Sequence, residues 1–536
     1  MSHEFSSNRS HVKNPISLQN MDDLYQKVEA KRVFYMEHDY QVEEIWECEF
    51  RKLLREDQAL ESFYKKRMRN LRESKVLPPL EARDSFYGGR VNAAKLYHES
   101  TTEEKILYYD FCSMYPYVIK YCRFPVGPPT IIKEFSSMDI SAFFGLIFCR
   151  ILPPKKLYFP VLPTRQHGRL MFVLCDACGE ALNQEECGHY DLDRCLVGTW
   201  VTEEVKKALE MGYELKELYE VWHYPKSAQY SADEKGLFED FINLWLKIKA
   251  ENSGWPANAT SEESKAAYIN SFRIREAVEL IKELITKNPG FRKVAKLMLN
   301  SFWGKFAQRS DVRKTSFIKE PEEFFNLLTN GSLKVHDAYL ISSLVMLVQY
   351  GKKENLIENL PHSNVALGAF TTAYARLKLY GLLELLQERV LYYDTDSVVF
   401  TANVNEAMPP TGAFLGDLTD EIAEKYGADA HLQRFVAGGP KNYAMEVKLQ
   451  DGTLRYDIKV KGLALGFNTA SVITFDSMKA LIDCNIDFIS VPQTRFTVGR
   501  YLDVFSKDFE KNYQFSFVKR RLLRNYLTLP YGYTHA

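Results

Sequence analysis

Tyr392-Tyr393-Asp394-Thr395-Asp396-Ser397 lies between two apolar segments, Val390 to Tyr393 and Ser397 to Thr401. We predict that these segments are paired strands of a hairpin. Side chains two positions apart on an extended chain project to one face, so Asp394 and Asp396 would repel each other unless a cation lies beside them. A hard, oxygen-ligated Mg²⁺ is the natural partner. The alternative is a polar β-turn without metal, but the apolar flanks favour acids presented at the edge of a core.

A further acid ends an apolar segment far upstream. Ile106 to Asp110 (ILYYD) is a predicted buried strand that ends on Asp110. Acids from two distant strand ends can converge on a pair of metal ions about 3.5–4 Å apart, the arrangement used in phosphoryl transfer. The sequence therefore predicts a nucleotidyl-transfer site whose catalytic acids are Asp110, Asp394 and Asp396.

A basic cluster follows at residues 282–314, with nine Lys or Arg against two acids. On its predicted helix, Arg292, Lys296 and Asn300 recur every four residues, with Trp303 close to the same stripe. Such a face can hold a triphosphate, and the flat Trp303 can pack on a base or sugar. The alternative is a solvated helix face. The scarcity of acids in the cluster favours the phosphate site.

Four soft metal ligands lie within 15 residues: Cys175, Cys178, Cys187 and His189. Thiols and imidazole at such spacing favour zinc, although the C-x-H end is less usual than C-x-x-C. The alternative is a surface loop with incidental cysteines. We predict a structural Zn²⁺ at this Cys/His patch.

The composition is that of a folded, non-membrane protein. Hydrophobic residues make up 46% and charged residues 26%, and 69 Lys and Arg against 70 Asp and Glu give a net charge of −1. This excludes a disordered chain and a globally basic DNA-packaging protein. There is no membrane-length apolar run and no secretory signal, so we expect an intracellular protein without a membrane partner. The predicted helical segments are a helical region over 22–82, then 202–211, 237–251, an antiparallel pair at 271–287 and 291–308, and 366–387.

Three motifs in this order resemble those of family B DNA polymerases. Asp110 to Pro116 (DFCSMYP) resembles motif A, with Met114 in place of leucine. Lys296 to Gly304 (KLMLNSFWG) is similar to motif B, with Trp303 at the usual tyrosine. Tyr393 to Ser397 (YDTDS) matches motif C. From about residue 83 onward the chain resembles the protein-primed branch, in particular the polymerases of Maverick/Polinton elements and related viruses.

The resemblance implies an α+β right-hand polymerase with an antiparallel palm sheet, helical fingers and thumb, and insertions in the palm. The expected domains are a helical N-terminal region (1–82), a first palm part with an insertion like the terminal-protein region and the Cys/His patch (83–265), fingers with an adjoining insertion (266–340), a second palm part with motif C (341–436), and a thumb with the C-terminal region (437–536). Phe86-Tyr87-Gly88-Gly89 is similar to the YxGG-type motif that joins exonuclease and polymerase domains.

The resemblance also implies roles for individual residues. Asp110 and Asp396 would be the main ligands of two Mg²⁺, for which Mn²⁺ can substitute, with Asp394 assisting and the Phe111 carbonyl completing a site. Tyr115 would lie under the deoxyribose and exclude a 2′-hydroxyl. Contacts to the incoming nucleotide are expected from Phe111, Ser113, Met114, Tyr115, Arg292, Lys296, Asn300 and Trp303. Contacts to DNA are expected from Gly88, Gly89, Arg90, Ser301, Gly304, Thr395, Lys441 and Lys461, although Leu463 departs from the aromatic residue that usually follows the last of these.

The implied activity is template-directed addition of dNTPs to a primer 3′-hydroxyl by two-metal nucleotidyl transfer. The expected partners are template-primer DNA, dNTPs and a terminal protein primer, in the replication of a mobile element or virus in a eukaryotic nucleus. The alternative is a catalytically inactive or domesticated DNA-binding relic of such a polymerase, and the intact Asp110, Lys296, Asp394 and Asp396 argue against it. A reverse transcriptase is disfavoured because its acidic motif has adjacent acids, whereas Thr395 separates them here.

Only 85 residues precede Phe86. That is short for a proofreading domain, and the adjacent Glu37, His38 and Asp39 are interpreted as a loop rather than as part of an acidic triad. We therefore expect no 3′–5′ exonuclease in this chain and interpret the N-terminal region as the helical remnant of a truncated product.

Overall fold

The structure, a computed structural model, describes residues 21–38, 41–45, 47–57, 59–61, 78–231, 234–309, 311–353, 363–403, 406, 408–499 and 503–535. The chain divides into two compact units, Met1–Pro79 and Leu80–Ala536. In the first unit, α1 (Met21–Glu37) and α2 (Glu47–Glu56) are described. Residues 39, 40, 46, 58 and 62–77 of the helical region predicted over 22–82 lie outside the described residues, and these include Asp39 of the predicted loop.

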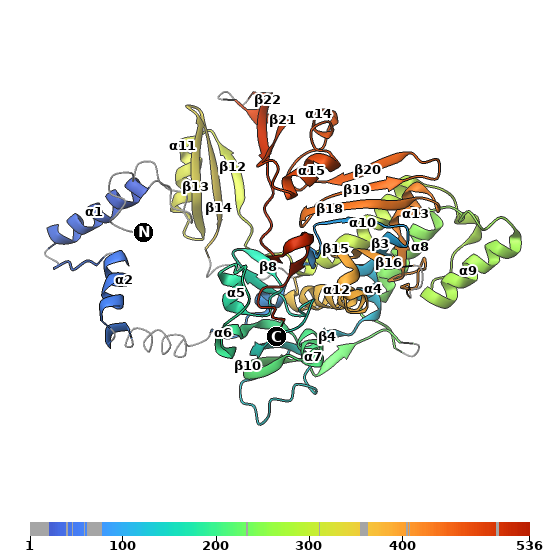
Figure 1. Cartoon of the computed structure of the whole chain (residues 1–536), viewed down its shortest axis with the longest axis horizontal. Helices are drawn as coiled ribbons and strands as arrows, with labels where there is room; N and C mark the ends of the chain where they lie inside the picture. Colours follow the sequence, from blue (N-terminus) through green and yellow to red (C-terminus); the bar gives the residue numbers. More distant parts are fainter. Residues whose placement is uncertain are drawn as a thin grey trace. The chain divides into compact units, whose positions relative to one another are not determined.

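The second unit is built on a nine-stranded antiparallel sheet (Figure 1). Its central hydrogen-bonded order is β1 (Val91–Ala93), β15 (Val390–Asp394), β16 (Ser397–Asn403), β3 (Glu104–Phe111), β18 (His431–Gly439), β19 (Asn442–Lys448) and β20 (Leu454–Lys459). In addition, β17 (Leu418–Asp420) pairs with β3 and β2 (Tyr97–Glu99) pairs with β18. The predicted hairpin over the acidic pair is thus β15–β16, and the predicted α+β class with an antiparallel sheet is confirmed.

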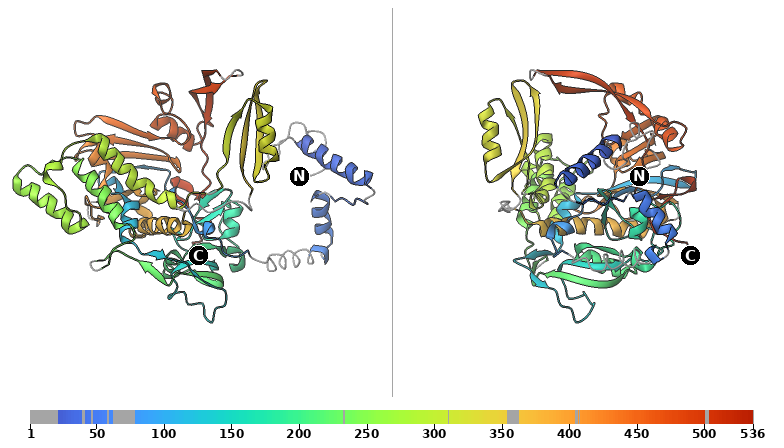
Figure 2. Two further views of the ribbon diagram at one scale, coloured as in Figure 1. Left: turned by 180° about the vertical axis from the view of Figure 1, so that it is seen from behind. Right: turned by 90° about the vertical axis from the view of Figure 1, so that its left-hand side faces the viewer.

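A long apolar helix, α12 (Val365–Leu386), lies between this sheet and a second, four-stranded sheet (Figures 1 and 2). The four-stranded sheet has the order β5 (Thr130–Ile132), β10 (Glu214–His223), β6 (Gly145–Leu152) and β9 (Leu196–Val201). Phe370 of α12 packs against Phe144 and Phe124, and these rings join the two layers. Most residues of α12 are buried and apolar, as expected for a helix that is covered by other elements, whereas Gly381 and Leu385 near its end are exposed.

Four helices supply residues to the cavity beside the acidic hairpin: α4 (Met114–Tyr121), α8 (Glu239–Glu251), α9 (Glu262–Glu276) and α10 (Pro289–Phe306). The prediction of an antiparallel pair from 271–287 and 291–308 is wrong. The chain leaves α9 at Ala277 in a left-handed conformation, and α10 packs instead on α8, with the rings of Phe241 and Phe302 stacked 3.9 Å apart. The buried Glu276 carboxylate accepts hydrogen bonds from the Lys120 ammonium and the Leu415 amide, which fixes the end of α9.

Smaller elements complete the unit. A three-stranded sheet of β12 (Lys314–Ile318), β14 (Val345–Lys352) and β13 (Leu333–Ser342) carries α11 (Pro321–Thr329), and β21 (Ile489–Val498) pairs with β22 (Val504–Tyr513). The domain boundaries expected at 266, 341 and 437 fall within α9, β13 and β18 respectively, so the division into palm, fingers and thumb remains a prediction. Among the described helices, none is long and apolar enough to cross a membrane.

Candidate active site

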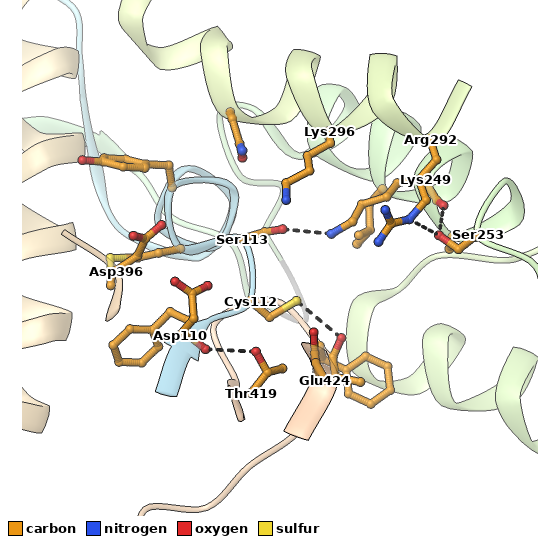
Figure 3. Close-up of a pocket in the computed structure, with 18 of the residues that line it drawn as sticks. Asp110, Cys112, Ser113, Lys249, Ser253, Arg292, Lys296, Asp396, Thr419 and Glu424 are labelled. Carbon is orange, nitrogen blue, oxygen red and sulfur yellow. Dashed lines mark hydrogen bonds between the residues drawn. The ribbon is translucent and has the colours of Figure 1, made fainter. Parts of the chain in front are cut away.

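A cleft of about 710 Å³ lies where the end of β3 meets α8 and α10 (Figure 3). Asp110 and Asp396 line one side, and Lys249, Arg292 and Lys296 line the opposite side. The structure therefore brings two of the three predicted acids and the predicted basic stripe into one cavity. Its walls also include the predicted residues Phe111, Ser113, Met114, Tyr115, Asn300 and Trp303.

Asp110 and Asp396 are held next to each other by the sheet. Register places Asp110 of β3 opposite Ser397 of β16, and the Phe111 amide donates a 2.7 Å hydrogen bond to the Asp396 carbonyl. Burial, followed by the negative charges of Asp396 and Glu421, raises the pKa of Asp110 to about 8. Burial and the neighbouring Asp394 also raise the pKa of Asp396. For both carboxyl groups, burial and neighbouring negative charges thus outweigh the nearby cations and disfavour the ionised form.

Asp394 has a different environment from Asp396. Thr395 takes a positive φ of 59°, and the Asp396 amide bonds to the Asp394 carbonyl across this tight turn. Asp394 and Asp396 therefore do not project to one face of an extended chain as predicted, because the strand ends at Asp394 and the turn follows. Asp396 lines the cleft, whereas both Asp394 carboxylate oxygens lie 3.1 Å from the Lys441 ammonium in the turn between β18 and β19.

The turn of motif C rests on the segment before β1. The Thr395 amide donates a 2.7 Å hydrogen bond to the Arg90 carbonyl. A Cβ on Gly89 would lie 2.6 Å from the Thr395 hydroxyl, so only glycine allows this approach. The Arg90 side chain is 1% exposed, stacks on Phe172 and donates to the Pro160 carbonyl. The expectation that Arg90 contacts DNA is thus wrong for its side chain, which is enclosed by the protein.

Sequence reasoning did not identify Lys249 and Arg376, two cations that the structure places at the cleft and behind the motif C turn. Lys249 of α8 donates a 3.0 Å hydrogen bond to the Ser113 hydroxyl, and burial followed by repulsion from Lys296 and Arg292 lowers its pKa. The helix 237–251 was predicted, but its packing against α10 was not. No sequence signal therefore indicated that Lys249 lies at the cleft. Arg376 of α12 donates to the carbonyls of Tyr87 and Gly88 and forms a buried ion pair with Glu204 of α7 (Thr202–Glu210). It positions the glycine pair behind the turn.

Tyr115 and Trp303 form one wall of the cleft. Their rings stack with centroids 4.7 Å apart and planes 13° from parallel. Burial raises the pKa of Tyr115 to about 12, so this phenol is neutral. Trp303, expected beside a base or sugar, thus backs Tyr115, and the pair makes a flat, stiff surface next to Asp396.

The residues predicted to contact DNA lie at two places. Lys441 and the exposed Lys461 flank motif C, where the Lys461 amide donates to the Asn442 side chain. Lys519 lies in the same region, where Lys461 and Arg169 repel its ammonium and Asp394 attracts it. On α10, Ser301 and Gly304 are exposed beside the cleft. Outside this region, Cys175, Cys178, Cys187 and His189 place one ligand atom each within 4.8 Å of one another.

Comparison with known proteins agrees with this arrangement. The sequence model of the family described as DNA polymerase type B, organellar and viral, matches residues 80–265 and 272–385, more than half of the chain. The chain belongs to this family. The family B prediction is therefore confirmed.

Individual relatives of this chain are distant. A probable DNA polymerase of Neurospora intermedia is 20% identical over 365 residues, which are 66% of this chain and 30% of the relative. A DNA polymerase of Bacillus phage PZA is 24% identical over 288 residues, which are 51% of this chain and 38% of the relative. The chain thus spans less than two fifths of the length of either relative.

Solved structures share the fold of this chain. The phi29 DNA polymerase in complex with primer-template DNA and incoming nucleotide substrates matches with a TM-score of 0.51 and 18% identity, over 85% of this chain and 66% of that chain. The same enzyme in its post-translocation binary complex matches with a TM-score of 0.50 and 17% identity, over 94% of this chain and 74% of that chain. The predicted right-hand polymerase fold is confirmed.

Proposed function

We propose that this polymerase adds dNTPs to the 3′-hydroxyl of a DNA primer under the direction of a template strand. The observation that carries the proposal is the meeting of two kinds of charge in one cleft. The partly buried Asp110 and Asp396 face Lys249, Arg292 and Lys296 (Figure 3). Acids that can hold metal, opposite cations that can hold a triphosphate, are what nucleotidyl transfer requires.

The acid side of the cleft fits divalent cations. Burial and like charge raise the pKa of both carboxyl groups, so the pair by itself resists full ionisation. Two carboxylates and a backbone carbonyl are the hard oxygen donors that Mg²⁺ prefers. Asp110, Asp396 and the Phe111 carbonyl would hold two Mg²⁺, for which Mn²⁺ can substitute. When bound, such ions supply acidification of the primer hydroxyl and neutralisation of the triphosphate.

The remaining lining residues select and orient the nucleotide. Lys296, Arg292 and Lys249 bind the triphosphate through charge-assisted hydrogen bonds. Asn300 lies on the same face of α10 and adds a neutral contact. Tyr115, stiffened by its stack on Trp303, lies under the deoxyribose and leaves no room for a 2′-hydroxyl.

The primer-template duplex contacts the side of motif C that carries Lys441, Lys461 and Lys519. Ammonium groups there neutralise backbone phosphates, which supplies affinity without sequence preference. Thr395 and the glycine pair Gly88-Gly89 lie at the same turn and approach the strand through the backbone. Ser301 and Gly304 approach the template from α10.

We further propose a terminal protein as the natural primer and replication of a mobile element or virus in a eukaryotic nucleus as the setting. The organellar and viral description of the family and the phage DNA polymerases among the relatives support the viral or mobile-element part of this proposal. The test is a primer-extension assay of the purified chain with Mg²⁺, on a primed template and, separately, on a template with a protein primer. Template-directed incorporation is expected. If neither substrate is extended while DNA still binds, the inactive DNA-binding relic is the better description.

A further inference from the structure

Four soft ligands converge in the loop around α5 (Asp176–Glu180), outside the candidate active site. The sulfurs of Cys175, Cys178 and Cys187 lie 3.5, 3.2 and 3.6 Å from Nδ1 of His189. Zinc–sulfur bonds of about 2.3 Å and a zinc–nitrogen bond of about 2.0 Å, in tetrahedral geometry, place a sulfur and a nitrogen about 3.5 Å apart. The three separations therefore match the edges of a tetrahedral zinc centre.

The surroundings favour thiolates at these positions. Cys175 and Cys178 are fully buried. The Cys178 amide donates to the Cys175 sulfur at 3.4 Å, and the Asn183 side chain donates to the Cys178 sulfur at 3.6 Å. Donors aimed at sulfur stabilise its charged form and orient it, as second-shell groups do around metal centres. Three sulfurs and one imidazole select zinc over Mg²⁺, which prefers oxygen.

The loop that carries these ligands also contacts residues 521–532, a segment that is distant in sequence. The Leu174 amide donates a 2.7 Å hydrogen bond to the Tyr531 carbonyl. Gln184, between Cys178 and Cys187, donates to the Tyr531 hydroxyl at 3.2 Å and accepts from the Leu522 amide at 3.0 Å. Gly532 packs so closely that a Cβ there would lie 2.5 Å from Cβ of Cys175. The segment therefore packs closely against the ligand loop and is hydrogen-bonded to it.

The other side of α5 is tied to the hairpin of β7 (Thr164–Gln166) and β8 (Arg169–Met171). The Gln166 amide group donates to the Asp176 carboxylate at 2.8 Å, and His167 Nε2 lies 2.9 Å from the Glu180 carbonyl. A five-residue helix is too short to be stable by itself. The position of α5 between the hairpin and segment 521–532 thus depends on contacts that hold the two ends of the helix in place.

We propose that Cys175, Cys178, Cys187 and His189 bind one structural Zn²⁺, and that this ion fastens segment 521–532 to the β7–β8 hairpin and α5. The ion closes the loop from Cys175 to His189 and so holds Leu174 and Gln184 where they bond to the segment. This role is separate from nucleotide addition.

The first test is metal analysis of the full-length chain, purified without chelators. About one zinc per chain is expected, and Cys178→Ser or Cys187→Ser should reduce the zinc content at least tenfold. The control is Cys484→Ser, because Cys484 is exposed and outside the cluster. Iron in place of zinc, less than a tenth of a zinc per chain, or full zinc content in both ligand variants would overturn the proposal.

The second test measures the anchoring in wild-type protein, so it does not depend on the folding of a variant. Hydrogen–deuterium exchange is followed before and after zinc removal with a chelator. Peptides covering 521–532 should exchange at least tenfold faster after removal and recover when zinc is returned, whereas a peptide over β16 should not change. Unchanged exchange over 521–532, or equal acceleration over β16, would overturn the anchoring role.

Discussion

The Lys441 ammonium lies 3.1 Å from each carboxylate oxygen of Asp394. The ion pair gives the two acids of the motif C turn different environments. Asp394 is neutralised by Lys441, whereas Asp396 lies in the cleft together with Asp110. The partly buried Asp110–Asp396 pair is accordingly the pair that we propose to bind metal. Asp394 and Lys441 instead hold the turn against the β18–β19 hairpin, next to the proposed primer strand.

Asp396→Ala should reduce dNTP incorporation by at least about 100-fold, since it removes a charge that acts at the reacting phosphate. Binding of template-primer DNA should persist, because the cations beside motif C are untouched. Single-nucleotide incorporation and a gel-shift titration measure the two properties. Asp457→Asn is the control, since Asp457 pairs with Lys425 away from the cleft. Incorporation near the wild-type rate by Asp396→Ala would refute the assignment.

Gly89→Ala should lower incorporation about 100-fold without unfolding the chain. The new Cβ would lie 2.6 Å from the Thr395 hydroxyl and would push the motif C turn out of place, and a displacement of about 1 Å at a reacting centre can cost that much. Gly88→Ala is the comparison, because a Cβ there meets no atom within 4 Å. Single-turnover rates and circular dichroism should show the larger loss at position 89 with both folds intact. Equal losses would argue against a steric origin.

Lys249→Met should raise the KM for dNTPs about tenfold, because a partly buried ammonium in the proposed triphosphate site would contribute roughly 1.4 kcal/mol or more to binding. Steady-state incorporation over a range of dNTP concentrations measures this change. Lys247→Met is the matched control on the same helix, since Lys247 does not line the cleft. If Lys249→Met leaves the KM unchanged, the ammonium only braces Ser113.

We expect the positive charge of Lys519 to destabilise the folded chain and, at the same time, to strengthen DNA binding. Burial, followed by repulsion from Lys461 and Arg169, lowers its pKa to about 8 from 10.5. The unfolded chain therefore holds this proton more tightly than the folded chain does. The resulting penalty is complete below about pH 8 and is relieved as the pH rises toward 10.5.

Lys519→Met should accordingly raise the Tm at pH 7, with a smaller gain at pH 10. It should also weaken template-primer binding and reduce the slope of log affinity against log salt by about 1. Thermal melts and fluorescence anisotropy over a salt series measure these effects, with the exposed Lys105→Met as the control. A lower Tm of the variant at pH 7 would show that the Lys519 charge does not destabilise the fold.

Much of the site was predictable because local sequence fixes it. The apolar strands before Asp110 and around Asp394 to Asp396, and the four-residue spacing of Arg292, Lys296 and Asn300, are short-range patterns. They led directly to the paired strands and the basic face that line the cleft. The family motifs depend on the same local residues.

Only tertiary structure decided the rest. Lys249 joins the phosphate side because α8, not α9, packs on α10, and helix pairing depends on side-chain fit over long sequence separations. Arg90 is enclosed and Asp394 is paired because Phe172 and Lys441, distant along the chain, reach them in the fold. The sequence alone determined which residue types carry the chemistry. The packing of distant segments determined which of them face one another, because burial and ion pairing are properties of three-dimensional neighbours.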